Sequence, residues 1–206
     1  MALLYKCARP LYGVWKIEET SVELLEKLEH KERYITFLAQ VSQERRRQEF
    51  LASRLLLREL LGKEEEISYR LSGAPYLVSR SFHISISHTN GFVAVILGDT
   101  PVGIDIEYRS DRVRKIRSRF MTQEEEKELD LNHELEHLLV HWCAKETLFK
   151  VKDQEGVDFQ KHLHVLPFHF KERRGCFTVK ETKTDRSNSY EFVYEVSDSY
   201  VLTRTK

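Results

Sequence analysis

The order of the expected secondary structure elements repeats along this chain, and the repeat strongly limits the folds it can adopt. In the first half, residue periodicity predicts one or two strands, two helices and two strands, over residues 3–16, 22–38, 43–61, 82–87 and 92–97. The second half gives a strand, helical sequence and three strands, over residues 102–108, 122–150, 176–180, 190–196 and 200–204. Gly62 is a typical helix stop, and turn residues occupy 72–75 and 88–91. The sequence therefore predicts an α+β fold with two halves of similar layout.

A turn over residues 98–101 separates the halves, so we expect domains at 1–100 and 101–206. No repeat of individual residues accompanies the repeat of layout. Of the 206 residues, 41% are apolar and 11% aromatic, which is enough to bury a core without disulfide bonds.

Charge and cysteine content exclude several classes of function. The 33 basic and 33 acidic residues cancel, so we expect neither nucleic acid nor a membrane surface as a partner of the whole molecule. No apolar stretch approaches the roughly 20 residues of a membrane span. Lys6 and Arg9 interrupt the first apolar run, so no signal peptide is expected. Three widely spaced cysteines indicate no disulfide framework and favour a reducing cytoplasm.

Two segments carry acidic side chains at regular spacing. Segment 103–107 reads G-I-D-I-E, and on a strand its Asp105 and Glu107 share one face. Segment 142–150 reads W-C-A-K-E-T-L-F-K, and on a helix its Glu146 falls on the same side as Trp142 and the leucines that precede it. Solvated acids on an exposed strand, or a salt bridge between Glu146 and Lys150, would explain them. The alternative is that Asp105, Glu107 and Glu146 together bind Mg²⁺, which prefers oxygen ligands.

The pattern H-E-x-x-H at 133–137, followed by His141, matches zinc metallopeptidases. On a helical wheel these histidines lie opposite the leucine stripe, so we expect them to face solvent. Val140 and Cys143 also stand where a metzincin has glycine and histidine. A solvated histidine face is the better interpretation.

Two basic segments are candidates for anion binding. The first is the helix with arginines at 45–47, 54 and 58, and the second is residues 109–119, with six basic residues. The first would suit a phosphate and the second an acidic protein. Alternatively, both are surface charge balanced by the glutamates at 64–66 and 124–126.

Taken together, the motifs resemble those of Sfp-type 4′-phosphopantetheinyl transferases. The family signatures G-[VI]-D-x-E and W-x-x-K-E-x-x-x-K correspond to residues 103–107 and 142–150. Two weaker motifs correspond to I-S-H at 86–88 and R-L-L-L-R at 54–58. Motif order and spacing agree over residues 45–152, and the ends agree in length and layout only.

The resemblance implies a pseudo-dimer of two similar α+β halves with the active site between them. It implies a holo-carrier-protein synthase that moves the 4′-phosphopantetheine group of coenzyme A to a serine of an apo acyl or peptidyl carrier protein. The reaction would depend on Mg²⁺ and release 3′,5′-ADP. Residues 1–100 would contact coenzyme A phosphates, and residues 101–206 would hold the metal and meet the carrier. A fused pair of halves has no need to oligomerise, so a monomer is expected.

The resemblance also assigns roles to residues. The metal ligands would be Asp105, Glu107 and Glu146, and Lys150 would bind the transferred phosphate with Lys145 nearby. Glu125 would be the general base, and it could at the same time form a capping box with Thr122. The catalytic residues would thus be Glu125, Lys150 and Glu146. Coenzyme A would be bound by Arg47, Arg54, Ser87, His88, Lys145 and Lys150.

The sequence departs from the family at 73–75, where G-A-P replaces the usual G-K-P. Ala74 supplies no charge, so coenzyme A binding would depend more on the arginines. Residues 109–120 would face the carrier, whose docking helix is acidic. Two other functions compete with the transferase: a homologue that binds coenzyme A or carrier without turnover, and a zinc hydrolase.

Overall fold

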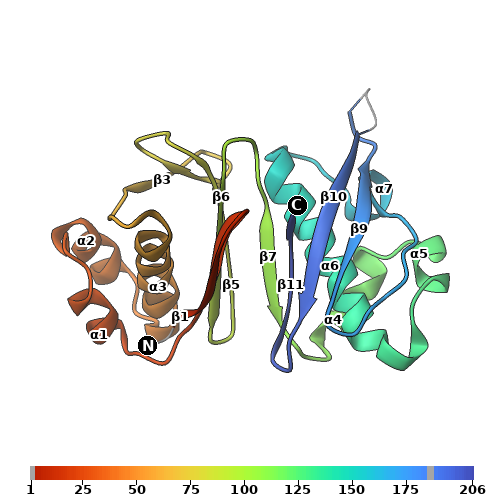
Figure 1. Ribbon diagram of the computed structural model, residues 1–206, viewed down its shortest axis with the longest axis horizontal. Helices are drawn as coiled ribbons and strands as arrows, with labels where there is room; N and C mark the ends of the chain where they lie inside the picture. The colour runs from red at the N-terminus through yellow and green to blue at the C-terminus, as the bar shows by residue number, and fades with distance from the viewer. Residues whose placement is uncertain (1–2, 185–187) are drawn as a thin grey trace. The chain divides into compact units, whose positions relative to one another are not determined.

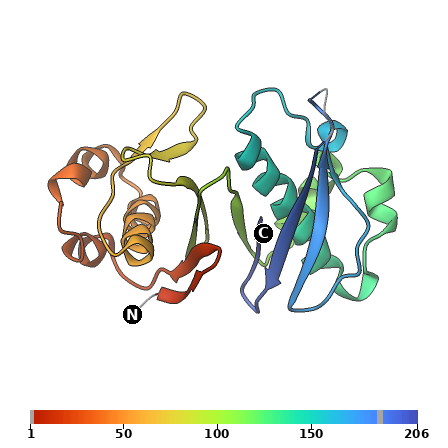
Figure 2. The same ribbon diagram turned by 45° about the horizontal axis from the view of Figure 1, so that its top comes forward.

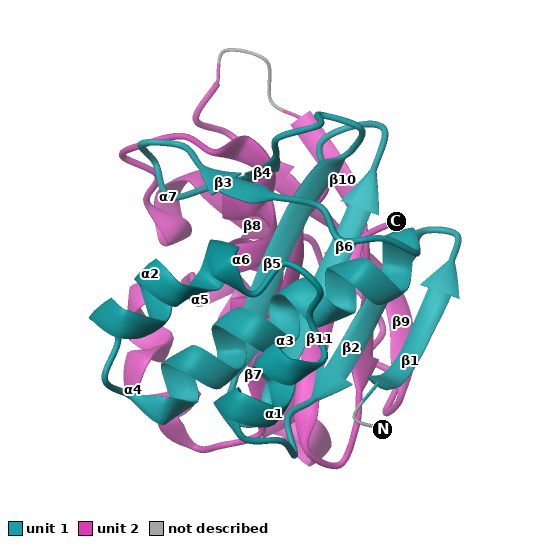
Figure 3. Cartoon of the chain, turned by 90° about the vertical axis from the view of Figure 1, so that its left-hand side faces the viewer, with its two compact units in different colours: residues 1–101 teal, residues 102–206 magenta. Residues whose placement is uncertain are grey.

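A computed structural model describes residues 3–184 and 188–206 (Figure 1). The chain forms two compact units, residues 1–101 and 102–206, which are coloured separately in Figure 3. Each unit combines helices with an antiparallel sheet, which confirms the α+β class.

Unit 1 is built on a four-stranded antiparallel sheet. Its strand order is β1 (Leu3–Ala8), β2 (Leu11–Lys16), β6 (Phe92–Gly98) and β5 (His83–Thr89). A separate hairpin pairs β3 (Ile67–Tyr69) with β4 (Pro75–Leu77). The helices are α1 (Ser21–Glu26), α2 (Glu32–Gln40) and α3 (Glu44–Leu61). Helix α3 packs on β2 and β6, where it buries Leu51, Leu55 and Leu56.

Several local predictions for unit 1 are confirmed. Gly62 ends α3 in the left-handed conformation at φ +74°, and Gly91 turns the β5–β6 hairpin at φ +77°. The predicted helix over 22–38, however, is two helices. Thr20 and Glu23 form a capping box that starts α1, but α1 ends at Glu26, and a new helix begins at Glu32. The short hairpin β3–β4 was not predicted as strands, since three residues give no readable alternation.

Unit 2 contains a five-stranded antiparallel sheet crossed by one long helix. The strand order is β7 (Ile104–Tyr108), β11 (Tyr200–Thr205), β10 (Asn188–Val196), β9 (Arg174–Glu181) and β8 (Leu163–Val165). Helix α6 (Glu134–Lys152) packs against β7 and β11, as Figure 2 shows. The shorter helices are α4 (Arg112–Ile116), η1 (Arg117–Arg119), α5 (Gln123–Lys127), η2 (Leu131–His133) and α7 (Phe159–His162).

The two units share a connectivity. In each, a strand that precedes the long helix pairs with the last strand of the unit: β2 with β6 in unit 1, and β7 with β11 in unit 2. The long helix, α3 or α6, packs on that strand pair. Each unit therefore contains one copy of the layout that the sequence predicted to repeat.

The predicted helical segment 122–150 is divided in the structure. Asp130 caps a short 3₁₀ turn, η2, between α5 and α6. The predicted apolar face is also partly wrong, because Leu131 is 84% exposed. Helix α6 is buried on more than one side, since α4 packs on it as well as the sheet, and Phe168 and Phe170 of the chain after β8 lie against its His137. A single apolar stripe does not describe such a helix. No helix in the described ranges has the length and apolarity that crossing a bilayer requires.

Gly103, which precedes β7, allows the strand to approach α6 closely. A Cβ atom on Gly103 would lie 2.4 Å from the carbonyl oxygen of Thr147 and 2.8 Å from Cγ2 of Val151. We therefore expect Gly103→Ala to lower the free energy of unfolding by about 2–3 kcal/mol, measured by denaturant titration. Gly62→Ala is the comparison, because nothing lies within 4 Å and only φ +74° opposes the methyl group. It should cost about 1 kcal/mol, and an equal or larger loss there would contradict the steric argument.

Candidate functional site

The acidic site of unit 2 consists of Asp105 and Glu107 on β7 and of Glu146 and Lys150 on α6. Asp105 lies in the middle of β7 and is 4% exposed. Its Oδ1 accepts a hydrogen bond of 2.7 Å from Nζ of Lys150, near the end of α6. The same Nζ donates to the carbonyl oxygen of Ile104 at 3.1 Å. Lys150, which the sequence offered as a partner of Glu146, is thus ion-paired with Asp105.

Glu107 is held by the first residue of the second signature. The indole Nε1 of Trp142 donates to Oε1 of Glu107 at 3.0 Å. Trp142 also packs against Phe120 and Phe159, so its ring is fixed. The two signatures therefore meet in space through Trp142 and Glu107 and through Lys150 and Asp105. Sequence reasoning did not assign this role to Trp142.

Glu146 experiences the charges of both strand acids. Burial, above all, and the Asp105 and Glu107 carboxylates raise its pKa, Lys150 lowers it, and together they bring it to about 7. Its ionised form is therefore penalised at neutral pH. The charges of Asp105 and Glu107 thus act on Glu146, and a shared role of the three acids as metal ligands stays a prediction.

These acids suit a hard divalent cation in ligand type and in charge. All three offer carboxylate oxygens, and a bound cation would relieve the repulsion that raises the pKa of Glu146. Among residues 3–184 and 188–206, however, no three acidic, histidine or cysteine side chains already converge as a set of metal ligands. Lys150 holds a positive charge against Asp105. The cation would therefore compete with this ammonium group.

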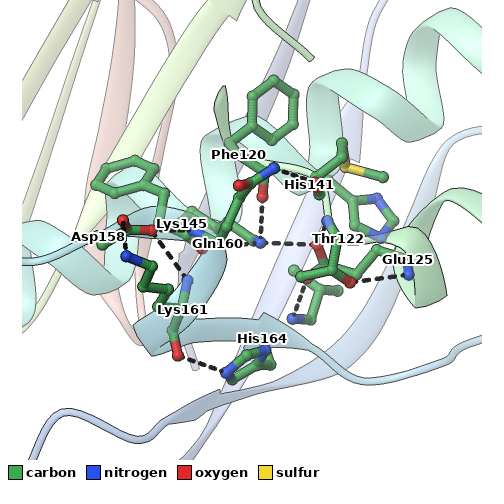
Figure 4. Close-up of polar contacts among 12 residues, drawn as sticks. Phe120, Thr122, Glu125, His141, Lys145, Asp158, Gln160, Lys161 and His164 are labelled. Carbon is green, nitrogen blue, oxygen red and sulfur yellow. Dashed lines mark hydrogen bonds and ion pairs between the residues drawn. The ribbon is translucent and has the colours of Figure 1, made fainter. Parts of the chain in front are cut away.

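Glu125 and Lys145 form a buried ion pair (Figure 4). Lys145, which is fully buried, donates to Oε2 of Glu125 at 2.7 Å and to the carbonyl oxygens of Phe120 and Phe159 at 2.5 and 3.1 Å. Burial lowers the pKa of Lys145, which the Glu125 charge opposes. All three hydrogens of the ammonium group thus have acceptors within unit 2.

Both oxygens of Glu125 accept hydrogen bonds from the protein. Oε1 accepts from the backbone of Val165 at 2.9 Å, and Oε2 accepts from the backbone of Thr122 at 2.9 Å as well as from Lys145. The capping box between Thr122 and Glu125 is confirmed. The geometry therefore favours Glu125 and Lys145 as residues that join α5, α6 and β8. The roles of general base and phosphate ligand stay predictions.

The histidines of the H-E-x-x-H pattern do not form a solvated face. His137 and His141 are each 2% exposed and pack with Phe168 and Phe170. Nδ1 of His137 accepts from the backbone of Asp130 at 2.9 Å, and Nδ1 of His141 lies 2.9 Å from the carbonyl oxygen of His137. The prediction of solvent-facing histidines is wrong for these two residues, because the aromatic chain after β8 covers them.

Burial of these histidines predicts acid sensitivity. The pKa of each is lowered from 6.5 to about 4, chiefly by desolvation. As pH falls below 6.5, the unfolded chain takes up these protons before the folded chain, so stability is lost between about pH 6.5 and 4. We expect His141→Leu to remove as much as about 2 kcal/mol of the stability difference between pH 7.5 and 5, measured by urea unfolding at both values. His169→Gln, at an exposed position, should leave that difference unchanged.

In unit 1, Arg54 is a buried cation whose hydrogen-bond partners are neutral. Its guanidinium stacks on Phe50 at 3.5 Å from the ring centroid, and Phe50 in turn stacks on Phe37. Nη1 donates to Oγ of Ser53 at 2.9 Å and to the Phe50 carbonyl, and Nη2 donates to the Tyr69 hydroxyl at 3.1 Å. Burial lowers the pKa of Arg54. A buried guanidinium with only neutral partners is compatible with an anionic ligand.

The other coenzyme A candidates lie in two places. Ser87 is buried within β5, and Nε of Arg47 donates to the carbonyl oxygen of Val41. His88, at the end of β5, contacts Arg46 and Glu49 instead. Neither Arg46 nor Glu49 was selected as a site residue from the sequence. Their spacing of three on a predicted helix was the available signal.

The basic segment 109–119 is half neutralised. Arg109 pairs with Glu136, Arg114 with Glu134 at 2.7 Å, and Arg117 with Glu126 and Glu134. Arg112, Lys115 and Arg119 are exposed, and Arg112 and Lys115, three residues apart on α4, lie on one side of that helix. Neighbouring glutamates therefore neutralise the charge of three of the six basic residues.

Comparison with known protein families adds a finding to this geometry. The family model described as the 4′-phosphopantetheinyl transferase superfamily matches residues 101–205, about half of the 206 residues. The chain belongs to this superfamily. The match spans unit 2, with both signature motifs and the acidic site, whereas the arginine-rich helix α3 and His88 lie outside it. No curated protein matches the chain. The match thus supports a transferase of this superfamily.

Proposed function

We propose that this chain transfers the 4′-phosphopantetheine group of coenzyme A to a serine of an apo acyl or peptidyl carrier protein, as an Sfp-type enzyme. The observation that supports this most is the meeting of the two signature motifs in unit 2, through Trp142 with Glu107 and Lys150 with Asp105, inside the region that matches the superfamily. The acids gathered there suit a metal-bound pyrophosphate. The two units would form a pseudo-dimer with the active site between them, and the enzyme would act as a monomer.

The acids would hold Mg²⁺ through Asp105, Glu107 and Glu146. A bound Mg²⁺ would neutralise charge on the pyrophosphate as the bond to the leaving 3′,5′-ADP breaks. Lys150, now at 2.7 Å from Asp105, would then be available to bind the transferred phosphate. Trp142 holds Oε1 of Glu107 by a hydrogen bond and so restrains this carboxylate.

Glu125 has two possible contributions to the reaction. As a general base it would accept the proton of the attacking serine hydroxyl. We favour a positioning role, because its oxygens already accept three hydrogen bonds and the ion pair with Lys145 is buried. In that role it keeps α5 and α6 together, and so keeps Glu146 and Lys150 in place.

Coenzyme A would be bound in part by unit 1. Arg54, with neutral partners, and His88, beside Arg46, are the candidates for its phosphates. Ala74, in the β3–β4 turn, supplies no charge, so these side chains would carry more of the affinity. The free cysteines Cys7, Cys143 and Cys176 fit a cytoplasmic enzyme.

Arg112, Lys115 and Arg119 are the proposed contacts for an acidic carrier helix. Reversing charge at Arg112 and Lys115 together should raise KM for the carrier by about tenfold at low salt, because attraction becomes repulsion. KM for coenzyme A should stay unchanged. The matched control reverses charge at Arg114, whose partner is Glu134. Equal effects of both changes on the carrier KM would contradict the assignment.

The deciding experiment incubates the protein with coenzyme A, Mg²⁺ and a panel of apo carriers, and measures carrier mass. We expect one added phosphopantetheine and release of 3′,5′-ADP. Binding of coenzyme A without a mass shift on several carriers would favour a homologue without turnover. Thermal stabilisation by zinc alone, with none by coenzyme A and Mg²⁺, would favour a zinc hydrolase.

A further inference from the structure

A buried carboxylate near the start of α3 organises three basic side chains. The side chain of Glu49 is 2% exposed, whereas those of Arg45, Arg46 and His88 are 60%, 52% and 39% exposed. The Glu49 carboxylate thus lies below the protein surface, and the three basic side chains lie between it and solvent. Glu49 belongs neither to the motifs of the sequence nor to the matched region.

The two carboxylate oxygens of Glu49 have different partners. Oε1 accepts from Nε of Arg45 at 2.8 Å. Oε2 accepts from Nη1 of Arg46 at 3.1 Å and lies 3.3 Å from Nδ1 of His88. The Glu49 side chain thereby joins α3, to which it belongs, to His88 at the end of β5.

The contact between Arg46 and His88 fixes the histidine tautomer. Nη1 of Arg46 lies 3.0 Å from Nε2 of His88, and a guanidinium can only donate. Nε2 therefore accepts, and the imidazole proton lies on Nδ1, which faces Glu49. Two basic side chains from different elements are held side by side by one acid.

Only part of the Arg46 guanidinium is used by these contacts. Within the part of the chain that the structure describes, its contacts to Glu49 and to His88 both involve Nη1. A guanidinium has five N–H donors in a planar fork, which matches two phosphate oxygens. The half-exposed side chain can therefore present its remaining donors to an anion outside.

We propose that Glu49 is a positioning residue that, together with His88, holds Arg46 in place to bind the 3′-phosphate of coenzyme A. The identity of this phosphate rests on the proposed function. Arg46, rather than Arg47, then supplies the arginine, because it is Arg46 that contacts both Glu49 and His88. Glu49 itself does not touch the phosphate.

Charge and position predict opposite effects for Glu49→Gln. The substitution removes a negative charge near a bound phosphate, so a purely electrostatic influence would strengthen coenzyme A binding. Loss of positioning would weaken it, because Arg46 would no longer be held in place and would lose entropy on binding. The sign of the change separates the two roles.

The experiment compares coenzyme A with 3′-dephospho-coenzyme A as substrates. For each protein we measure kcat/KM for both, and take their ratio as the preference for the 3′-phosphate. Glu49→Gln should lower this preference about tenfold, the effect of about one charge-assisted hydrogen bond. The loss should lie in KM for coenzyme A, and KM for the dephospho substrate should change little.

Two variants control for folding and for coupling. Glu59→Gln, on the same helix and paired with Arg58, should leave the preference unchanged. Arg46→Gln, at an exposed position, should lower it even if Glu49→Gln folds poorly. In the double variant, Glu49→Gln should add little to Arg46→Gln, since it acts through that arginine.

The outcomes separate this inference from the proposed function. A wild-type enzyme that prefers coenzyme A, with the same or greater preference in Glu49→Gln, would overturn the role of Glu49 alone. A wild-type enzyme that transfers from both substrates equally well would also overturn it and leave the transferase intact. No transfer from either substrate to any carrier would overturn both.

Discussion

Glu146→Gln should reduce phosphopantetheinyl transfer by on the order of 10²–10³-fold while the chain stays folded. Glu146 is the acid of the site with the least favourable charge, since burial and the carboxylates of Asp105 and Glu107 raise its pKa to about 7. Glutamine keeps the shape and removes the charge that a cation would need. Carrier mass after reaction at saturating Mg²⁺ measures the loss.

Stability provides the second measurement for this variant. The folded-state pKa of Glu146 is raised above its ordinary 4.5, so at pH 8 ionisation penalises the folded state more than the unfolded state. Without Mg²⁺, Glu146→Gln should therefore melt at the same temperature as the wild type or higher. Added Mg²⁺ should stabilise the wild type and not the variant.

Matched variants distinguish the acidic site from a general effect of charge. Asp105→Asn should lose transfer to a similar extent, and it also removes the ion pair with Lys150. Glu191→Gln, on the exposed side of β10 and paired with Lys206, should keep full activity. Near-normal transfer by Glu146→Gln would count against the metal site, whatever its melting temperature.

The second large effect is expected from the buried pair of unit 2. Replacing Lys145 by methionine should lower the free energy of unfolding by about 3–5 kcal/mol, because it leaves the Glu125 carboxylate buried without its cation. Glu125→Gln should destabilise for the converse reason. Urea unfolding at pH 7.5 measures both changes.

The double variant identifies the pair as the cause. Lys145→Met combined with Glu125→Gln leaves no uncompensated charge, so it should be more stable than either single variant. Additive losses would mean that the two side chains stabilise unit 2 independently.

Activity of the same variants bears on the general base. If Glu125 only positions α5 and α6, transfer per folded molecule should fall equally in Lys145→Met and Glu125→Gln. If Glu125 is the base, Glu125→Gln alone should lose an additional factor of on the order of 10²–10⁴. Both assays must be run at a temperature where each variant is folded.

Local patterns predicted the elements that carry the site. Alternation placed Asp105 and Glu107 on one strand, and Thr122 with Glu125 gave a capping box that the structure contains. Gly62 ended α3 as expected. These features depend on residues two to four positions apart, and the backbone geometry of a strand or a helix turn is enough to relate them.

Helix faces were predicted less well. The wheel for α6 placed His137 and His141 toward solvent, but Phe168 and Phe170 cover them. A periodic pattern shows which side of a helix is more apolar, and it does not show how many neighbours will pack on that helix. Helix α6 has neighbours on two sides, so polar residues are buried as well.

The sequence by itself determined the transferase motifs, the repeated α+β layout and the acids of the site, because each is written in short-range spacing. Tertiary structure alone decided that Lys150 pairs with Asp105, 45 residues away, that Lys145 pairs with Glu125, and that Glu49 meets His88. Which partner a charged side chain takes depends on elements brought together by packing. An ion pair between distant residues therefore has no signature in the spacing of either one.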